Sequence, residues 1–346
     1  MDIKTFVSQR SAVFAELDKL REEIWQNASA DAYFQRQQNN SDNATPELKR
    51  RFFEVMRNIA KEINGATQFI NDIEVRRNNG HRAPPPRVLD LCMAPGGFSE
   101  EVRQSLSPLS EFNGITLPRK LGGHILLLEH STRLKVEFLD ITMLAGEMGF
   151  AMTDIPLDHP DRDLFRFDRP FYDQKYDLIL CDGQVLRTHK REEYREKTEA
   201  VRLSVSQLVF ALQHMKKGGS FVMLLHNADA SHVFNLIYKF RQISASIQIF
   251  KPTKYHTIRS SFYLVAKGVN PQSADALRAV NEWKEIWASC TIHRCGEVPP
   301  ISDETIREIL VDFGVEFIEL CEPMWKVQVD ALSRKLKNGF DNFFRF

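Results

Sequence analysis

The chain is poor in cysteine, and the cysteines that it has form no pattern. The five are scattered along 346 residues: Cys92, Cys181, Cys290, Cys295 and Cys321. An odd and scattered set argues against a disulfide framework. Cys290, His293 and Cys295 lie close in sequence but lack a second matching pair, so we expect no metal site there.

Long apolar runs and an excess of one charge are also missing. No window approaches 18 consecutive apolar residues, which argues against a transmembrane helix and a membrane location. The start, Met1 to Lys4, lacks the apolar core of a signal peptide, so we expect a cytoplasmic or nuclear protein that is not secreted. Forty-six basic and 46 acidic residues cancel. A nucleic acid would therefore have to bind a local basic patch.

What is present divides the chain into three parts. Residues 1–80 carry apolar residues at three- and four-residue steps, as helices do, with a polar break over 38–43 and a second run from Pro46. Residues 81–269 alternate apolar strands with amphipathic helices, and residues 270–346 are helical again. We therefore predict an α/β protein with a Rossmann-like, doubly wound and mostly parallel sheet. Helical extensions are expected at both ends, packed on the sheet or on a protein partner.

The expected elements follow from the same patterns. Strands are predicted at 88–91, 113–117, 125–128, 135–139, 178–181, 220–225, 247–250 and 262–266. Helices are predicted at 194–215, ending at Lys216-Lys217-Gly218-Gly219, and at 232–240, 274–288, 303–313 and 325–346. We interpret the phenylalanines of the last helix as anchors on the body of the protein.

One ten-residue segment carries the strongest functional signal. It reads Asp90-Leu91-Cys92-Met93-Ala94-Pro95-Gly96-Gly97-Phe98-Ser99 and follows a short apolar strand. The carboxylate would stand at the carboxyl end of the strand, where open α/β sheets bind ligands. Pro95 favours a turn, Gly96 and Gly97 allow a close backbone approach, and Ser99 suits the first helical turn. Such an arrangement suits a charged nucleoside, although a tight connection without a ligand is the alternative.

Two common nucleotide motifs are absent. The segment lacks the G-x-G-x-x-G spacing of dinucleotide-binding proteins, and the chain has no G-x-x-x-x-G-K-[ST] sequence. The pattern thus disfavours both NAD and a nucleoside triphosphate as the ligand.

The order of motifs resembles the FtsJ-type RNA methyltransferases. The segment 90–99 is followed by Asp140-Ile141, by 176–183 ending in Asp182-Gly183, by 217–222, and by Lys251-Pro252 with 259–265. The resemblance covers about residues 87–268 and implies S-adenosylmethionine (SAM) as the cofactor. Its first motif and the Asp182-Gly183 strand end are specific together.

The resemblance also implies the cofactor contacts. The methionine part of SAM would lie among Asp90, Cys92, Ala94, Pro95, Gly96, Gly97, Phe98 and Ser99. Asp140 and the backbone of Ile141 would bind the adenine, and Asp182 would face the methyl donor. Thr116 stands where the family has an acidic residue for the ribose, and Glu129 is a rival for that contact.

The catalytic positions depart from the family. Its members use a Lys-Asp-Lys-Glu set, but Leu224 and Ser261 occupy the main lysine and glutamate positions, so only Asp182 is retained. Lys61 is the nearest candidate for the first lysine. His226 lies on the same strand face as Leu224 and suits proton transfer, although its position is more typical of a strand-end histidine bonded to a loop. We expect Asp182 and His226 to be the catalytic residues, with His256 a weaker candidate.

Two local basic clusters are candidate RNA contacts. They span Arg187–Arg191 and Lys251–Arg259, and the second includes Tyr255, on which a base could stack. Acidic residues follow the first cluster at once, so a solvated surface explains it nearly as well. Two functions remain open: an RNA methyltransferase with an altered catalytic set, or an inactive relative that acts as a SAM-binding or scaffold protein.

Overall fold

The computed structural model describes residues 2–73 and 84–340. Most of the segment that joins the first helical part to the sheet, and the last three phenylalanines, fall outside these ranges. Within them, no helix combines the length and apolar character needed to cross a membrane.

A seven-stranded sheet forms the centre, in the order β3-β2-β1-β4-β5-β7-β6. The strands are β1 (Arg87–Leu91), β2 (Glu111–Thr116), β3 (Leu134–Phe138), β4 (Tyr176–Cys181), β5 (Met215–His226), β6 (Ser246–Phe250) and β7 (Ser261–Val269). The five strands from β3 to β5 pair in parallel, and only β7 runs antiparallel to its neighbours. The predicted doubly wound, mostly parallel sheet is confirmed.

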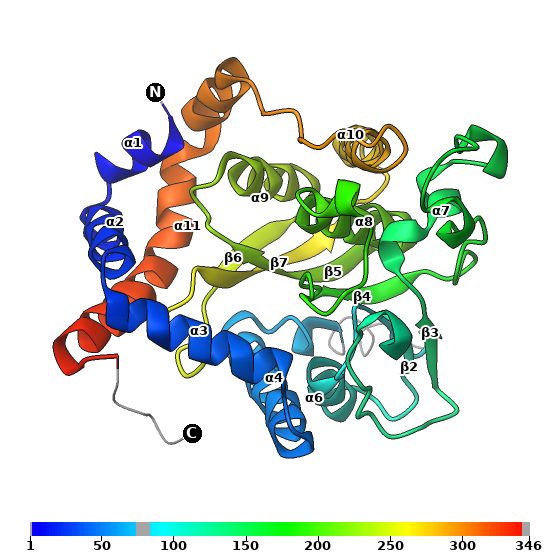
Figure 1. Cartoon of the computed structure of the whole chain (residues 1–346), viewed down its shortest axis with the longest axis horizontal. Helices are drawn as coiled ribbons and strands as arrows, with labels where there is room; N and C mark the ends of the chain where they lie inside the picture. Colours follow the sequence, from blue (N-terminus) through cyan, green and yellow to red (C-terminus); the bar gives the residue numbers. More distant parts are fainter. Residues whose placement is uncertain (1, 74–83, 341–346) are drawn as a thin grey trace.

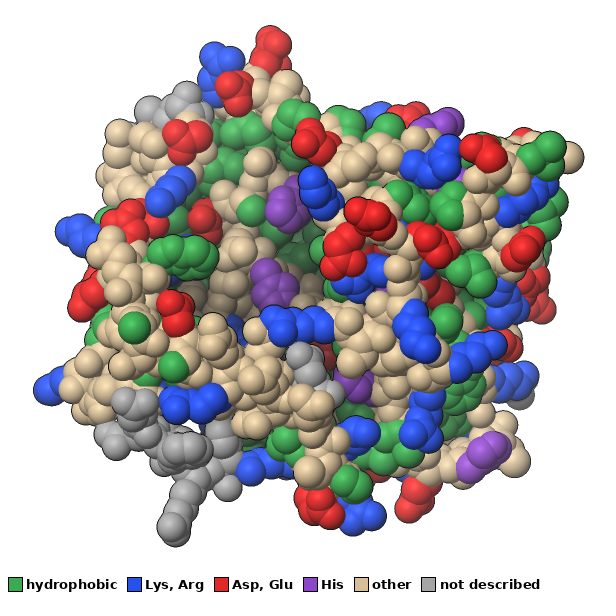
Figure 2. All heavy atoms as spheres, viewed as in Figure 1, with side chains coloured by type: hydrophobic (Ala, Val, Ile, Leu, Met, Phe, Trp, Pro, Cys, Tyr) green, Lys and Arg blue, Asp and Glu red, His purple; other side chains and the backbone are tan. Residues whose placement is uncertain are grey.

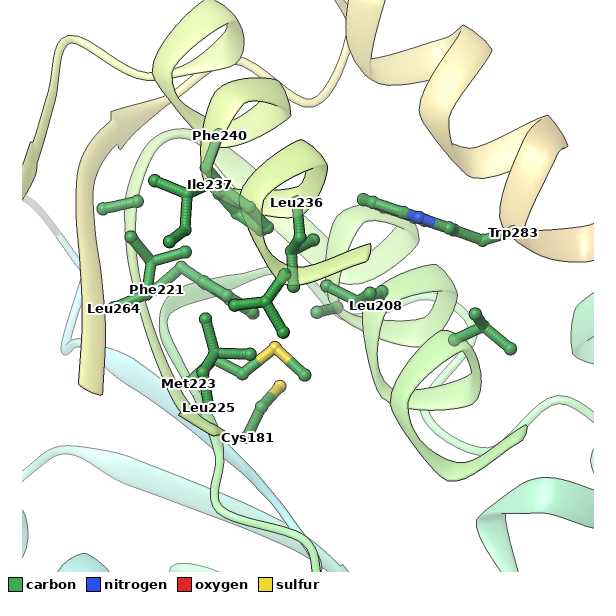
Figure 3. Close-up of a cluster of buried hydrophobic side chains, with 14 of the residues drawn as sticks. Cys181, Leu208, Phe221, Met223, Leu225, Leu236, Ile237, Phe240, Leu264 and Trp283 are labelled. Atoms are coloured by element: carbon green, nitrogen blue, oxygen red, sulfur yellow. The ribbon is translucent and has the colours of Figure 1, made fainter. Parts of the chain in front are cut away.

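Helices cover both faces of the sheet (Figure 1). One face carries α8 (Glu199–His214), α9 (Ser231–Ile243) and α10 (Ala274–Thr291), and the other carries α4 (Pro46–Thr67) and α6 (Gly97–Ser105). Figure 3 shows the first core layer, in which Phe221 and Met223 of β5 point toward Ile237 and Phe240 of α9. Alternate residues of β5, such as Val222, belong to the second layer under α4 and α6. The apolar part of the strand, residues 221–225, is largely buried between the two layers, as a central strand of a parallel sheet requires.

The remaining helices of the N-terminal part pack on the C-terminal one. They are α1 (Ile3–Ser8), α2 (Ala12–Trp25) and α3 (Ala28–Asp42), and α2 lies along α11 (Asp303–Asn338). The rings of Phe14 and Trp325 lie 4.8 Å apart at this contact. Phe340 is buried against Tyr33 and Phe34 of α3, which confirms it as an anchor. The two ends of the chain thus form one helical layer beside the sheet.

Short helices fill the connections. They are α7 (Ala145–Met148) and the 3-10 turns η1 (Arg119–Leu121), η2 (Ile141–Met143), η3 (Met152–Asp154), η4 (Arg162–Leu164) and η5 (Glu193–Arg195). Of these, η2 begins directly after β3, and Asp140 caps it by accepting a hydrogen bond from the Thr142 amide.

Four element predictions were wrong. Residues 125–128 form no strand, because the Leu127 amide donates to the Pro95 carbonyl rather than to a neighbouring strand. The segment 216–219 does not end a helix but belongs to β5. The two helices predicted after residue 303 are one helix, α11, which continues through Pro323. The polar break at 38–43 is largely the last turn of α3, where Asn39 and Asn40 are exposed.

Candidate active site

The carboxyl ends of the parallel strands meet at one edge of the sheet, where β1 leads into α6. Asp90, near the end of β1, is buried and accepts a 2.6 Å hydrogen bond from the Ser99 hydroxyl of α6. Burial raises the pKa of Asp90 to about 7, against the smaller lowering effect of the Ser99 hydrogen bond. At neutral pH this carboxyl is therefore poised between its two protonation states.

The two glycines after Pro95 are closely covered by the chain itself. Gly96 has a φ of +101°, and a Cβ there would lie 2.6 Å from Leu128 Cγ. A Cβ on Gly97 would lie 2.0 Å from the Phe53 carbonyl oxygen of α4. Bare backbone is thus needed for α4 and the segment 126–128 to close over the loop, in addition to any ligand contact.

The loop forms one wall of a narrow cleft. The cleft is lined by Met56, Asp90, Cys92, Met93, Ala94, Pro95, Gly96, Gly97, Phe98 and Asp182. The structure therefore brings most of the residues predicted for the methionine part of SAM together with Asp182. Ser99 stands behind Asp90 through the hydrogen bond described above.

Asp182 follows β4 and faces the same cleft. Its Oδ1 accepts a 3.3 Å hydrogen bond from the Tyr263 hydroxyl of β7. Burial and the negative charge of Asp90 raise the pKa of Asp182 to about 8. Among the described residues neither carboxylate has an ion-pair partner. One buried and one partly buried acid with no cation beside them suit a ligand that carries positive charge, as SAM does on its sulfonium and ammonium groups.

Two predicted cofactor residues stand farther along the edge. Thr116, at the end of β2, is buried and accepts a 3.3 Å hydrogen bond from the Ala94 amide, which ties it to the loop. Asp140, after β3, lies with Ile141 outside the cleft lining. Burial would raise the pKa of Asp140, but the hydrogen bond and charge of His189 outweigh this effect and hold the pKa at about 2. Asp140 is therefore ionised and already compensated.

His226 ends β5 and lies near the cleft without lining it. Its Nε2 is 2.9 Å from the side-chain oxygen of Gln184, two residues after Asp182. Partial burial, together with the charges of Arg259 and Lys251, lowers the pKa of His226. Leu224 packs against the apolar layer under α4, and Ser261 is buried opposite His226 in the β5–β7 ladder. Lys61 is exposed on α4.

The two basic clusters differ in the partners that their charged groups contact. Arg191 pairs with Glu196 at 2.7 Å, so part of the first cluster is neutralised on the surface. In the second, the Lys251 ammonium is buried and donates to the carbonyl oxygens of His256, Arg259 and Ser261. Lys251 thus fixes the β6–β7 loop, while Arg259 stays exposed. Figure 2 shows the face of the molecule that is turned to the viewer in Figure 1. Near its centre is a hollow with histidine side chains in it and basic side chains beside it.

Sequence reasoning missed three residues of this region. Met56 of α4 lines the cleft, Tyr263 bonds to Asp182, and His189 faces Asp140. Met56 and Tyr263 stood in patterns noted for other reasons, an apolar stripe and a strand. His189 had no signal beyond its place in a basic run.

Several known methyltransferases are similar to this chain at low identity. The chain is 25% identical over 199 residues to ribosomal RNA large subunit methyltransferase E of Albidiferax ferrireducens, covering 57% of this chain and 81% of that protein. Human methyltransferase-like protein 13, solved with S-adenosylhomocysteine (SAH), matches with a TM-score of 0.32 and 14% identity, over 66% of this chain and 89% of that one. An rRNA methylase from Streptococcus thermophilus matches with a TM-score of 0.34 and 10% identity, over 60% and 96%. At these scores the two structures add nothing to the topology described above.

The family comparison covers more than half of the chain. The FtsJ-like methyltransferase family matches residues 62–269, from the second half of α4 to the end of β7. All residues of the cleft except Met56 lie in this range. The chain therefore belongs to the FtsJ-like methyltransferase family, whose methyl donor is S-adenosylmethionine.

Proposed function

We propose that this protein is a SAM-dependent methyltransferase that acts on RNA. The observation that carries the proposal is the cleft in which the buried Asp90 and the partly buried Asp182, with no cation beside them among the described residues, face a glycine loop at the carboxyl edge of the sheet. The family and the name of the curated relative, a ribosomal RNA methyltransferase, support RNA as the substrate.

In this proposal the cofactor lies along the sheet edge. The loop Asp90–Ser99 holds the methionine part, Thr116 lies beside the ribose, and Asp140 with the Ile141 amide binds the adenine. When bound, SAM supplies a methyl group that is already activated. The protein then has to align an acceptor with it and exclude water, and alignment alone accounts for a large part of such catalysis.

Asp182 and His226 are the proposed catalytic residues. The lowered pKa of His226 keeps its imidazole neutral at pH 7, which is the form that can accept a proton. Asp182 lies at the cleft, held by Tyr263, and would orient the acceptor. A histidine and an acid would then replace the lysine-centred set, because Leu224 cannot exchange a proton. A ribose hydroxyl and a base nitrogen are both suitable acceptors for this pair.

The loop between β6 and β7 is the proposed RNA contact, with Arg187–Arg191 as a second one. Helices from both ends of the chain hold this loop. Glu62 of α4 accepts from the Thr253 amide at 2.8 Å, and the Gln328 amide of α11 donates to the Ile258 carbonyl at 3.3 Å. We accordingly propose helical extensions at 1–80 and 270–346 around a methyltransferase domain at 81–269, with the extensions shaping the RNA surface or binding a protein partner.

A second function is favoured by one observation. Leu224 and Ser261 leave two positions of the catalytic set without an ionisable group, and Leu224 is part of the apolar layer. In this alternative the protein binds SAM but transfers no methyl group, and serves as a scaffold.

Calorimetric titration with SAM, followed by transfer of labelled methyl to total RNA, separates the two. Binding and transfer support the enzyme, and binding without transfer supports the scaffold. Absence of SAM binding would contradict both.

A further inference from the structure

The loop that follows Asp182 places a histidine between two buried carboxylates. His189 Nε2 lies 3.2 Å from Asp140 Oδ2, and its Nδ1 lies 3.4 Å from Glu199 Oε1. The three side chains are 8%, 9% and 2% exposed, respectively. Each ring nitrogen therefore faces a different carboxylate, so the ring bridges Asp140 and Glu199.

Arginines lie beside the same carboxylates. Arg195 lies 3.1 Å from Asp161 and 3.7 Å from Asp140, and Arg202 pairs with Glu199. Asp140, His189 and Glu199 are also close enough together to suggest a metal site. However, the two ring nitrogens point to different carboxylates, and the arginines already compensate these, so the cluster needs no ion.

This network fixes the direction of the Asp140 carboxylate. Its Oδ1 accepts from the amide and the hydroxyl of Thr142 at 2.9 and 2.8 Å, while Oδ2 faces His189 and Arg195. The loop that carries His189 is itself tied to the segment after β2. The Thr188 hydroxyl donates to the Gly122 carbonyl at 2.9 Å, and the Lys190 amide donates to the Leu121 carbonyl. A change in this loop would therefore turn the carboxylate.

We propose that His189 is a positioning residue for the adenine of the cofactor. Held in turn by Glu199, it orients Asp140 so that a carboxylate oxygen accepts from the adenine amino group. This links the loop that begins at Asp182, on the acceptor side, to the adenine side of the same cofactor. The inference rests on the proposed function, since it requires SAM to bind along this edge.

The test compares two ligands that differ only at the group that Asp140 would recognise. SAH carries the adenine amino group, whereas its 6-deamino analogue, which has unsubstituted purine in place of adenine, carries only hydrogen there and cannot donate. We expect the wild-type protein to bind SAH at least about tenfold more tightly by calorimetry, the effect of about one hydrogen bond to a charged group. His189→Ala should reduce this preference to below about threefold.

Two further variants keep the result interpretable. His189→Gln retains one N–H donor toward Asp140, so we expect it to recover part of the preference. His214→Gln is the matched control, because His214 is also buried and lies 2.9 Å from a carboxylate, that of Glu147, away from the cleft. It should lower the melting temperature but leave the ligand preference intact.

Several results would overturn the positioning role. An unchanged preference in His189→Ala or, if that variant does not fold, in His189→Gln would contradict it, as would loss of the preference in His214→Gln. Loss of the wild-type preference on adding EDTA would show that a metal ion, and not the His189 ring alone, orients Asp140. If the wild-type protein binds neither ligand, the proposed function fails as well, which distinguishes that failure from the others.

Discussion

The aspartates along the carboxyl edge of the sheet have pKa values that are shifted in opposite directions. At β1 and β4, Asp90 and Asp182 have only hydroxyl groups as hydrogen-bond partners among the described residues. Burial raises the pKa of Asp90 to about 7, and burial with the charge of Asp90 raises the pKa of Asp182 to about 8. At β3, Asp140 is also buried, but His189 holds its pKa at about 2. Among the described residues no cation lies beside the carboxyls at the methionine end of the proposed cofactor site, so a compensating positive charge has to come from the ligand. At the adenine end, groups of the protein already compensate the carboxylate.

This difference matches the charges of SAM. The sulfonium and ammonium groups lie at the methionine end, and the neutral adenine needs only an acceptor. A desolvated carboxylate without a positively charged partner is unfavourable in the folded protein. The methionine end therefore lowers the stability of the free protein, and a bound cation would restore it. The following predictions test the two regions against each other.

Substitution of Asp182 has the largest expected effect. Asp182→Ala should reduce methyl transfer by about 1000-fold or more, since alignment of the acceptor and a favourable charge at the methyl donor are lost together. Transfer of labelled methyl to RNA measures it. Asp177→Asn is the control, because Asp177 pairs with Lys216 at the other end of β4. An unchanged rate in Asp182→Ala would refute the role of this residue.

Substitution of Gly97 by alanine tests how closely α4 packs on the glycine loop beside Asp90 and Asp182. Gly97→Ala should destabilise the protein by about 3 kcal/mol or more, since overpacking against backbone forces α4 away from the loop. Gly65→Ala on α4 has nothing within 4 Å of the added carbon and should instead stabilise by up to about 1 kcal/mol. Urea unfolding of both variants measures the contrast. Equal effects would show that α4 does not close over the loop.

Substitution of His226 tests whether this residue acts as the base in methyl transfer together with Asp182. His226→Gln should slow transfer by about 100-fold while leaving SAM affinity unchanged, because the residue lies outside the cleft lining. In the wild-type protein the lowered pKa of His226 predicts a rate that stays high down to pH values below 6.5 and falls only when the ring gains a proton. A variant with the wild-type rate would leave His226 as a strand-end residue bonded to Gln184.

The smallest effect is a slope in stability against pH. Carboxyls whose pKa is raised bind protons in the folded state that the unfolded state has released. Each therefore lowers the free energy of unfolding by about 1.4 kcal/mol per pH unit between about pH 4 and the folded pKa. Asp182→Asn should remove this contribution up to about pH 8, whereas Asp140→Asn should not flatten the slope. Thermal unfolding between pH 5 and pH 8 gives the comparison, and identical slopes for wild type and Asp182→Asn would contradict the raised pKa.

The elements that the sequence predicted well are those that depend on the conformational preferences of neighbouring residues. The turn at Pro95 to Gly97 and the strands around it follow from backbone preferences and apolar runs, so the topology and the position of the glycine loop were foreseeable. Residues 125–128 show the limit, since an apolar run can pack on a neighbouring loop instead of joining a sheet. Likewise Lys216 to Gly219 have a helix-ending composition, but pairing with β4 and β7 makes them part of β5.

Long-range electrostatics could not be predicted. Nothing near Asp140 in sequence shows that His189 and Arg195 will compensate it, and nothing near Asp182 shows that Tyr263 will reach it. The contrast between the two regions depends on contacts between segments far apart in the chain. For the same reason the sequence predicted a contact with the cofactor for each aspartate, and a catalytic role as well for Asp182, but no difference in charge environment.

The central claim, that Asp90 and Asp182 form a site prepared for a cation, is tested most directly by calorimetry with SAM and SAH. The two ligands differ by the methyl group and the positive charge of the sulfonium. We predict that SAM binds more tightly than SAH and that its binding releases protons at pH 7, seen as a heat that depends on the ionisation enthalpy of the buffer. Equal affinities together with a buffer-independent heat would contradict the account.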